Sequence, residues 1–261
     1  MSKKPAIFFL GVIATLIFML PAASMAKDSP PPLADVWLIT AKAGQGSDLY
    51  DALEKHMAFR SEHGDPRAWQ VYSPMLGDAL NRVAIRFCCF SWADQDAYSE
   101  WREAAEKIGD HFGEHVTPHI ENISHYFENI DWENSNWNEE SGPYKLFAVT
   151  EFNLKPGKIG QYDAARNKMS QIALNQGWAT ADHSWVWTTT IGGKSQGAII
   201  IPHKNFADMD RDEEGFIEFL AKHMGSAEAA AELMANFSES AWSSEFQIWE
   251  HNEDASMSSD D

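Results

Sequence analysis

The stretch that decides the fold is VWLITAKAGQGSDLYDALEKHMAFR, residues 36–60, because its pattern returns as LFAVTEFNLKPGKIGQYDAARNKMSQI over residues 146–172. Each copy opens with an apolar run that is typical of a β-strand. Each then reaches a glycine-containing turn and continues with apolar residues at helical spacing. The shared markers are Lys42-Ala43-Gly44 with Tyr50-Asp51-Ala52, and Lys155-Pro156-Gly157 with Tyr162-Asp163-Ala164. The sequence therefore predicts a strand, a turn and a helix twice.

The repetition extends beyond this stretch to most of the chain. Matching motifs follow in the same order and at offsets of 112 to 116 residues. Such an order with small insertions indicates two homologous domains. The matching motifs are Trp69-Gln70-Val71-Tyr72 with Trp185-Val186-Trp187, Ser91–Asp96 with Asn205–Asp210, and His111-Phe112-Gly113 with His223-Met224-Gly225.

Each half predicts the element order β-α-β-β-α-β, the ferredoxin-like unit. The second and third strands fall at 69–72 and 83–90 in the first half and at 184–189 and 198–201 in the second. Closing strands are expected near 124–127 and 245–249. We expect an α+β protein whose two antiparallel sheets pack face to face as an intramolecular α/β barrel. The predicted boundaries are a tail at 27–34, repeat 1 at 35–127, a linker at 128–143, repeat 2 at 144–250, and an acidic disordered tail at 251–261.

The N-terminus has the pattern of a secretory signal peptide. Lys3 and Lys4 precede an apolar run of 15 residues from Ala6 to Leu20, and small residues lead up to Ala26. We predict cleavage after Ala26 and a periplasmic or secreted protein. The alternative is an uncleaved anchor, but 15 helical residues span only about 22 Å, less than the roughly 30 Å of a bilayer core.

The charge balance excludes some partners. The chain carries 39 acidic and 20 basic residues, a formal net charge of −19. Loss of residues 1–26 would remove two lysines and no acids, which leaves −21. Such an acidic chain repels nucleic acid and anionic membrane surfaces. No stable membrane insertion is expected after cleavage. The hydrophobic content of 44% is ample for a core.

Several of these motifs resemble the dimeric α/β-barrel superfamily. They are the Lys-Pro-Gly-Lys of 155–158, the Tyr-Asp-Ala that follows it, and the Ser-Trp-Ala-Asp-Gln-Asp-Ala of 91–97. The superfamily includes antibiotic-biosynthesis-type monooxygenases, haem-degrading monooxygenases and chlorite-dismutase relatives. The resemblance implies a monomer with an internal pseudo-dimer, and it leaves further oligomerisation open. It brings no catalytic residue with it, because the Asn, Trp and His constellation of the haem-degrading members is absent at matching positions.

Ser91 and Asn205 have the character of helix N-caps rather than of a catalytic site. Asp94 and Asp208 stand three residues later, as a capping box requires. Carboxylates at a helix start are stabilised by the helix dipole by about 0.3–1 kcal/mol each. A structural role explains this repeated motif.

Aromatic residues on the central strands suggest a ligand cleft. Most of the 11 tryptophans are expected in the core, but those on the central strands could line a pocket for an apolar or aromatic molecule. The candidate ligand-binding residues are Trp69, Tyr72, Trp185 and Trp187, together with His111 and His223.

A histidine series supports an alternative. His111, His115 and His119 stand four residues apart and would share one face of a continuous helix. Imidazoles at this spacing can hold a transition metal, and one of them could ligate haem. Pro118 interrupts the helix where the third ligand is needed, and only His111 has a counterpart in the second half. No cofactor is therefore the first expectation.

The only two cysteines, Cys88 and Cys89, are adjacent. Neighbours in a strand point to opposite faces, so we expect two free thiols, with a strained vicinal disulfide as the alternative.

The function expected from the sequence is the binding of a small apolar or aromatic molecule in a sheet–helix cleft. A haem- or metal-handling enzyme resembling the superfamily's monooxygenases is the second hypothesis, and a protein–protein assembly module is the third. Whether the chain is an enzyme, and what its substrate or ligand is, stay open at this point.

Overall fold

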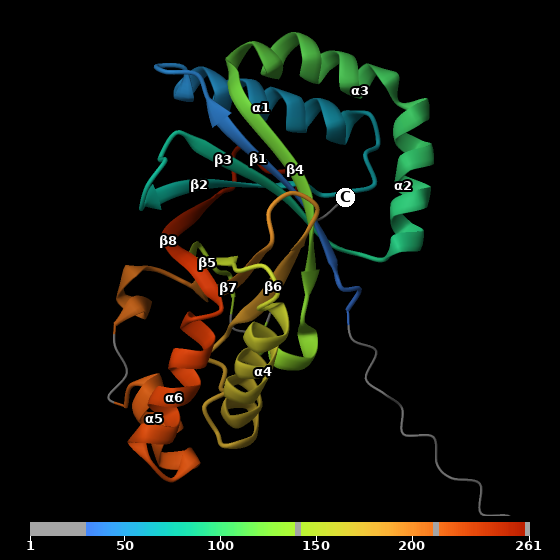
Figure 1. Cartoon of the computed structure of the whole chain (residues 1–261). Coiled ribbons are helices and arrows are strands. Elements are labelled where there is room, and N and C mark those ends of the chain that lie inside the picture. The colour runs from blue at the N-terminus through green and yellow to red at the C-terminus, as the bar shows by residue number, and fades with distance from the viewer. Residues whose placement is uncertain (1–29, 139–141, 211–213, 259–261) are drawn as a thin grey trace, which may run out of the picture.

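The computed structural model describes residues 30–138, 142–210 and 214–258. The predicted signal peptide and its cleavage site after Ala26 lie outside the described residues. Eight strands form one closed antiparallel barrel in the order β1-β3-β2-β8-β5-β7-β6-β4 (Figure 1). The strands are β1 (Leu33–Ala41), β2 (Gln70–Leu76), β3 (Arg82–Phe90), β4 (Ile120–Ile130), β5 (Leu146–Leu154), β6 (Val186–Ile191), β7 (Gln196–His203) and β8 (Ala241–Asn252).

The two halves are joined by hydrogen-bonded strand pairs at two seams. β8 pairs with β5 of its own half and with β2 of the other half, from Val71 opposite Asn252 to Leu76 opposite Ile248. β4 pairs in the same way with β1 and with β6. The predicted closing strands are too short because each extends across a seam. This closure confirms the predicted α+β barrel.

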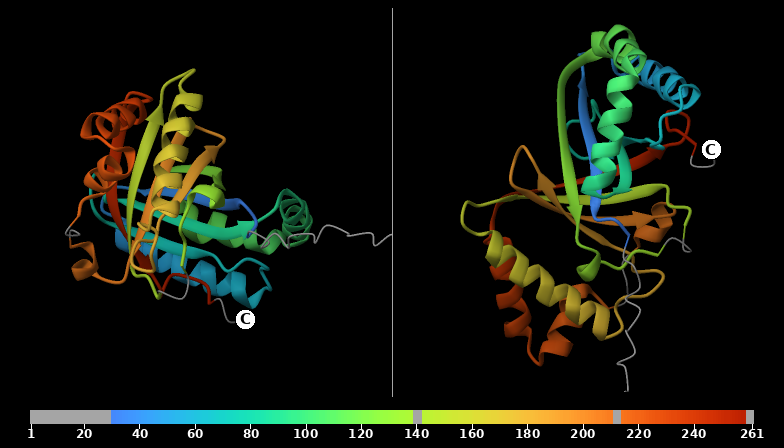
Figure 2. Two further views of the ribbon diagram at one scale, coloured as in Figure 1. Left: turned by 90° about the horizontal axis from the view of Figure 1, so that it is seen from below. Right: turned by 90° about the vertical axis from the view of Figure 1, so that its right-hand side faces the viewer.

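The helices cover the outer surface of the barrel, one group over each half (Figures 1 and 2). Each half has one long helix after its first strand and two shorter ones after its third, where the sequence predicted a single second helix. The helices are α1 (Gly46–Glu62), α2 (Trp92–Ala104), α3 (Glu106–His111), α4 (Ile159–Asn175), α5 (Phe216–Met224) and α6 (Ala227–Ser238).

The long helices α1 and α4 define the register between the halves. Both contain 17 residues, and their buried positions coincide at an offset of 113. Leu49 then corresponds to Tyr162, and both side chains are fully buried. The Tyr-Asp-Ala motifs are therefore one residue out of structural register, although the duplication that they indicated is real.

The capping prediction for Ser91 is confirmed in full. The Ser91 hydroxyl accepts from the Asp94 backbone N–H, and the Asp94 carboxylate accepts from the Ser91 backbone N–H at the start of α2. Hydrogen bonding to Ser91 lowers the pKa of the Asp94 carboxyl. Asn205 caps only a 3-10 turn, Phe206–Met209.

The predicted disordered tail at 251–261 is wrong over most of its length. β8 continues to Asn252, and the chain then folds back so that Ala255 and Met257 are buried in the core of the first half. The Met257 N–H donates to the Trp69 carbonyl at 2.8 Å, and Val71 N–H donates to the Ser256 hydroxyl. Burial of Ala255 and Met257, together with these two hydrogen bonds, holds the segment against the first half.

Two further expectations need correction. The predicted linker at 128–143 begins inside β4, where Glu128 lies opposite Ala34 and Thr190. Cys88 and Cys89 form a vicinal disulfide with a cis peptide bond between them, so the two free thiols that we favoured are not present.

In the described ranges, none of the helices is long and apolar enough to cross a bilayer.

Candidate functional site

The first half contains a cavity between the outer face of its sheet and α1, α2 and α3. Its volume is about 360 Å³. Strand alternation explains its polar wall, because every second residue of β1 and β4 points outward from the barrel. Asp35, Trp37 and His125 thus face the helices, whereas Val36 and Leu38 face the barrel interior. The remaining lining residues include Met57, Trp69, Ile85, Tyr98, Ile108 and Phe112.

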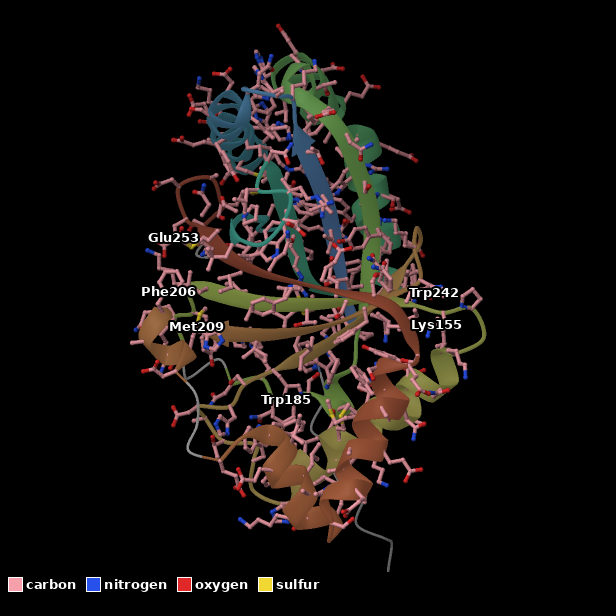
Figure 3. All side chains as sticks on the ribbon, turned by 60° about the vertical axis from the view of Figure 1, so that its left-hand side comes forward. Lys155, Trp185, Phe206, Met209, Trp242 and Glu253 are labelled. Atoms are coloured by element: carbon pink, nitrogen blue, oxygen red, sulfur yellow. A yellow bond between two sulfur atoms is a disulfide. The ribbon has the colours of Figure 1, made fainter. Side chains whose placement is uncertain are left out.

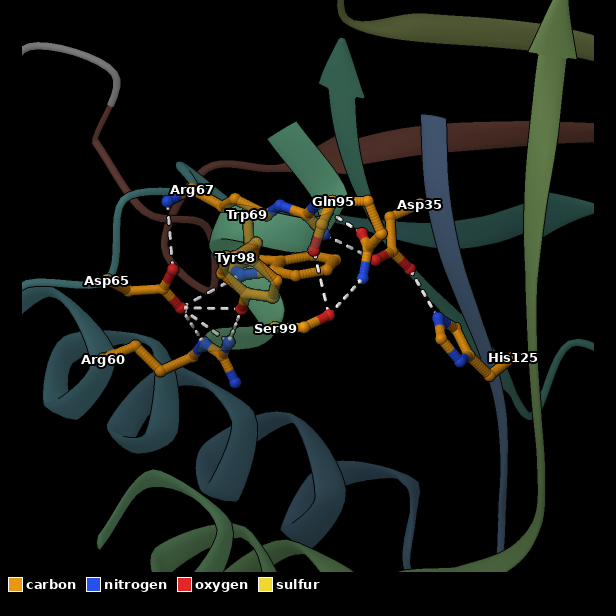
Figure 4. Close-up of polar contacts among 9 residues, drawn as sticks. All are labelled: Asp35, Arg60, Asp65, Arg67, Trp69, Gln95, Tyr98, Ser99 and His125. Atoms are coloured by element: carbon orange, nitrogen blue, oxygen red, sulfur yellow. Dashed lines mark hydrogen bonds and ion pairs between the residues drawn. The ribbon is translucent and has the colours of Figure 1, made fainter. Parts of the chain in front are cut away.

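An ion pair lies buried beneath this cavity (Figure 4). The Arg67 guanidinium donates to Asp35 Oδ2 at 2.7 Å, and both side chains are less than 5% exposed. Its other terminal nitrogen donates to Gln95 Oε1 at 2.7 Å. The Arg67 carbon Cζ lies 3.7 Å from the centre of the Tyr98 ring. Burial lowers the pKa of Arg67, and the Asp35 carboxylate opposes that shift. Arg67 is therefore the buried counterion of the Asp35 carboxylate.

His125 is attached to the same carboxylate. Its Nε2 atom lies 2.7 Å from Asp35 Oδ1, and its ring stacks on Trp37 with 3.9 Å between centroids. The side chain is 34% exposed and lines the cavity. Because a carboxylate paired with Arg67 is an acceptor only, Nε2 carries a proton, and in the neutral ring Nδ1 then bears the lone pair. Among the described residues, none forms a hydrogen bond with Nδ1.

A second network fixes the opposite wall of the cavity (Figure 4). Asp65 Oδ2 accepts from Arg60 Nε at 2.6 Å and from the Trp69 indole N–H at 3.1 Å. Arg60 also donates to the Tyr98 hydroxyl at 2.6 Å. Burial raises the pKa of Tyr98, so its hydroxyl stays protonated. These contacts hold the Trp69 ring in one orientation.

His56 closes the inner end and is 1% exposed. Burial lowers its pKa to about 3, with smaller contributions from the charges of Arg60, His111 and His115. Its Nδ1 lies 3.1 Å from Nδ1 of His111, so one of the two rings donates to the other. Its Nε2 lies 3.4 Å from Arg60. His56 is therefore a neutral residue with both nitrogens in use.

The second half has a cavity in the equivalent place, with a volume of about 470 Å³. Trp178, Trp185 and Trp187 line it, and the indole N–H groups of the last two are bonded to the Asn134 carbonyl and the Ser170 hydroxyl. No arginine or lysine is among its described lining residues. Its ionisable residues are Asp182, Asp208, Asp210, His183 and His203.

A third cavity, of about 200 Å³, lies inside the barrel. Tyr72 lines it, 5.3 Å from the Phe147 ring. Arg86 and Glu128 form an ion pair there at 3.3 Å. Burial raises the pKa of Glu151, and the nearby charge of Glu128 adds to that rise.

The candidate ligand residues from the sequence thus divide among three places. Trp69 lines the first cavity, Trp185 and Trp187 line the second, and Tyr72 lies inside the barrel. His111 contacts His56 and Phe59 but does not line a cavity. His223 packs on Phe219 at 4.5 Å. The structure therefore does not assemble them into one cleft; Figure 3 shows Trp185 between the barrel strands and the helices of the second half.

The histidine series does not converge either. The helix changes to a π-helical turn at Phe112–Val116 and to a 3-10 turn at Thr117–His119. His111 and His115 stay close, at 4.4 Å between rings, but His119 bonds to Gln45 Oε1. In the part of the chain that the structure describes, no three His, Cys, Asp or Glu residues are placed to hold a metal ion.

Sequence reasoning missed Asp35, Arg67 and His125. A signal did exist for Asp35, since a carboxylate beside Trp37 in an otherwise apolar strand is unusual. Arg67 and His125 come from a loop and a distant strand. Only the fold shows that both reach the same carboxylate.

Comparisons with known proteins give the fold but no nearer relationship. No protein-family model and no curated protein sequence matches the chain. A proposed monooxygenase from Lactobacillus acidophilus NCFM superposes with a TM-score of 0.50 at 12% identity, over 85% of this chain and 94% of that one. An anthrone oxidase-like protein superposes with a TM-score of 0.50 at 12% identity, over 85% of this chain and 91% of that one. A proposed monooxygenase from Fusobacterium nucleatum superposes with a TM-score of 0.51 at 10% identity, over 85% of this chain and 93% of that one. The chain has the dimeric α/β-barrel fold, with both halves of the barrel in one polypeptide.

Proposed function

We propose that the protein binds a small, largely apolar aromatic molecule in the cavity of its first half, after export to the periplasm or the medium. The observation that carries this proposal is the composition of that cavity. Aromatic and aliphatic side chains form most of the wall, and polar groups fixed by hydrogen bonds, Asp35 with His125 on one side and Arg60 on the other, interrupt it. Ligand pockets commonly have this composition, and a volume of about 360 Å³ suits a molecule of two or three fused rings.

The rigidity of the wall supports the same proposal. The Trp69 indole is held by Asp65, and Trp37 is stacked on His125. Because these rings are already fixed, a flat ligand would lose little side-chain entropy on binding.

The binding test uses 2-methoxynaphthalene, titrated by isothermal calorimetry into the purified chain. Gly109 lines the cavity, and a Cβ added there meets no atom within 4 Å. We expect Gly109→Phe to fill the cavity and weaken binding at least tenfold. Gly113→Phe is the matched control, because Gly113 is exposed in the next turn, outside the cavity, and has equally free space.

Ala173→Phe, in the cavity of the second half, tests the other location. Unchanged binding by Gly109→Phe together with loss of binding by Ala173→Phe would contradict the assignment to the first half.

Export is tested separately, by expressing residues 1–261 and measuring the mass of the purified product by mass spectrometry. A mass that begins at Lys27, recovered from the periplasm or medium, is the expected result. An intact N-terminus in the membrane fraction would favour the anchor alternative.

A second candidate is an enzyme of the monooxygenase or haem-handling kind. Proposed monooxygenases and an anthrone oxidase-like protein share the fold, which supports this class at the level of fold only. In the first cavity His56 has both ring nitrogens in use and the Nε2 of His125 is held by Asp35, which leaves Nδ1 of His125 as the imidazole nitrogen there that could ligate a haem iron. A visible spectrum of the exported protein decides the matter: a Soret band would support haem handling, and a colourless protein favours the simple ligand pocket.

A further inference from the structure

His125 lines the first cavity, and its ring atom Nδ1 has no hydrogen-bond partner among the described residues; the exposed Glu106 carboxylate is a second basic group in the lining. The His125 ring is fixed on two sides, by the Asp35 carboxylate at Nε2 and by the Trp37 face. A carboxylate behind an imidazole fixes the tautomer and stabilises the imidazolium that forms when the ring takes a proton. An imidazole held in this way can act as a general base.

The surroundings indicate where the proton comes from. The described residues that line this cavity include no serine, threonine, cysteine or lysine, so among them the base has no hydroxyl, thiol or amine nucleophile to activate. The Tyr98 hydroxyl already accepts from Arg60 and lies 3.4 Å from the Asp65 carboxylate. The remaining sources are the ligand and water, and the mostly apolar wall favours the ligand.

We propose that His125 is a general base that removes a proton from the carbon next to the carbonyl of an aromatic ketone bound in this cavity, with Asp35 as its positioning residue. This inference rests on the proposed binding function. The ligand C–H bond breaks, its electron pair remains on the ligand as an enolate, and the proton goes to Nδ1 of His125. Return of a proton from Nδ1 to carbon restores the ketone or, at another carbon, gives an isomer. No oxidant or reductant is consumed.

The charges around His125 suit this step. Before it, Arg67 and Asp35 balance each other, and the reacting form of the imidazole is the neutral one. After it, the imidazolium lies between the Asp35 carboxylate and the enolate, so each new charge has an opposite neighbour. Arg67 and Gln95 hold Asp35 in place throughout.

The second half shows that the fold does not require these residues. Strand pairing places Ala148 where the first half has Asp35, and Phe246 where it has His125. Phe246 is 58% exposed. An Asp–His pair is therefore an addition to one half of a duplicated frame.

The experiment follows exchange of the α-protons of 2-tetralone for deuterium by proton NMR in D₂O. The wild-type chain is expected to accelerate exchange above the buffer rate. His125→Gln, whose amide can still donate to Asp35, is expected to lower the protein-catalysed rate at least 100-fold, since general bases contribute about 10²–10⁴. His115→Gln is the matched control, because the exposed His115 side chain lies outside the cavity. The His115→Gln variant should catalyse the exchange of the 2-tetralone α-protons at the wild-type rate.

Asp35→Asn tests the positioning role. An amide that donates to Nε2 would move the ring proton to Nδ1 and remove the basic lone pair from the cavity. We expect exchange to fall while 2-methoxynaphthalene still binds. Collapse of the cavity would abolish both, and Asp35→Glu should restore part of the exchange rate.

The outcomes separate this inference from the binding proposal. Failure of 2-methoxynaphthalene to bind the wild-type chain would overturn both. Binding with exchange at the buffer rate, or equal exchange by wild type and His125→Gln, would overturn the general base alone. Hydrolysis of 2-naphthyl acetate that depends on His125, without tetralone exchange, would assign the base to water and also overturn the proposal.

Discussion

The two halves of the barrel have the same frame but different chemistry on its outer faces. At the offset of 113 residues, Arg60 and His56 on α1 correspond to Ala173 and Met169 on α4, and all four line the cavity of their half. The first cavity is bordered by buried charges. Three tryptophans line the second, and its described lining residues include no arginine or lysine.

This difference teaches where a duplicated fold can diverge. Residues that hold the strands and helices together keep their burial in both copies. Residues that point from the sheet toward the helices change in size and charge, because a cavity there tolerates substitution. The predictions below test this contrast, from the largest expected effect to the smallest.

The largest effect is expected at Arg67. Arg67→Ala leaves the Asp35 carboxylate buried without its guanidinium, and removing one partner of a buried ion pair costs about 3–5 kcal/mol. Chemical denaturation measures the change in the free energy of unfolding. In the second half the Arg166–Asp131 pair is more exposed at its carboxylate, so Arg166→Ala is expected to cost less. Equal losses would contradict the contrast between the halves.

His56 should make the first half sensitive to acid. Its pKa is about 3 in the folded chain and 6.5 unperturbed, so below pH 6.5 the unfolded chain takes up a proton that the folded chain does not. Stability from this group is complete above pH 6.5 and is lost as pH falls toward 3. His56→Met, which copies the residue at position 169, should remove this component.

The measurement is the difference in unfolding free energy between wild type and His56→Met as a function of pH. At about 1.36 kcal/mol per pH unit, we expect it to change by about 2–3 kcal/mol between pH 6.5 and 4.5. His63→Gln serves as the control, because His63 is exposed on the same helix end. A difference that stays constant with pH would show that His56 is not buried as a neutral ring.

The fold could be predicted because its determinants are local and occur twice. Periodicity located the strands and α1 and α4, and the repetition predicted that the two halves have the same element order. The strand pairs that join the two halves were harder to predict. β2 pairs with β8 across about 180 positions of sequence, and no local pattern indicates such a pairing. The vicinal disulfide and the docked C-terminus depend on tertiary contacts of a few residues.

The residues of the candidate site were harder to predict from the sequence than the fold. Tryptophans attract attention by their type, and they do line both outer cavities. Asp35, Arg67 and His125 are common residue types in separate segments, and only strand register brings them together. The histidine spacing of four was misleading, because the helix that should align the three rings changes its winding after His111.

The C-terminal segment gives a smaller effect that is specific to the first half. Met257 is 7% exposed and packs with Trp69 and Val71 in that core. Met257→Ala is expected to cost about 2 kcal/mol, within the usual range for a buried methionine. Thermal unfolding provides the measurement. Glu253→Ala, at an exposed position of the same segment, should change stability by less than about 0.5 kcal/mol. If both variants unfold like wild type, the segment is not docked.

The smallest expected effect is a coupling energy between two positions, which arises from an exchange of volume between the cores of the two halves. Leu49 and Val83 in the first half correspond to Tyr162 and Gly197 in the second, so a larger ring on the helix faces a glycine on the strand. A Cβ on Gly197 would overlap the Tyr162 ring. The Tyr162 side chain is fully buried, so the packed core restricts any shift of its ring, and its Oη has no hydrogen-bond partner among the described residues.

Gly197→Ala is therefore expected to lower the free energy of unfolding by about 1–3 kcal/mol, whereas Gly160→Ala, in open space on α4, should raise it slightly. Tyr162→Leu supplies the decisive comparison, because it copies the residue of the first half. Tyr162→Leu should cost clearly less in the Gly197→Ala background than in wild type, with a coupling of about 1 kcal/mol or more in a double-mutant cycle. Additive effects would mean that the ring and the glycine do not share one space, and the correspondence at 113 residues would lose its clearest physical consequence.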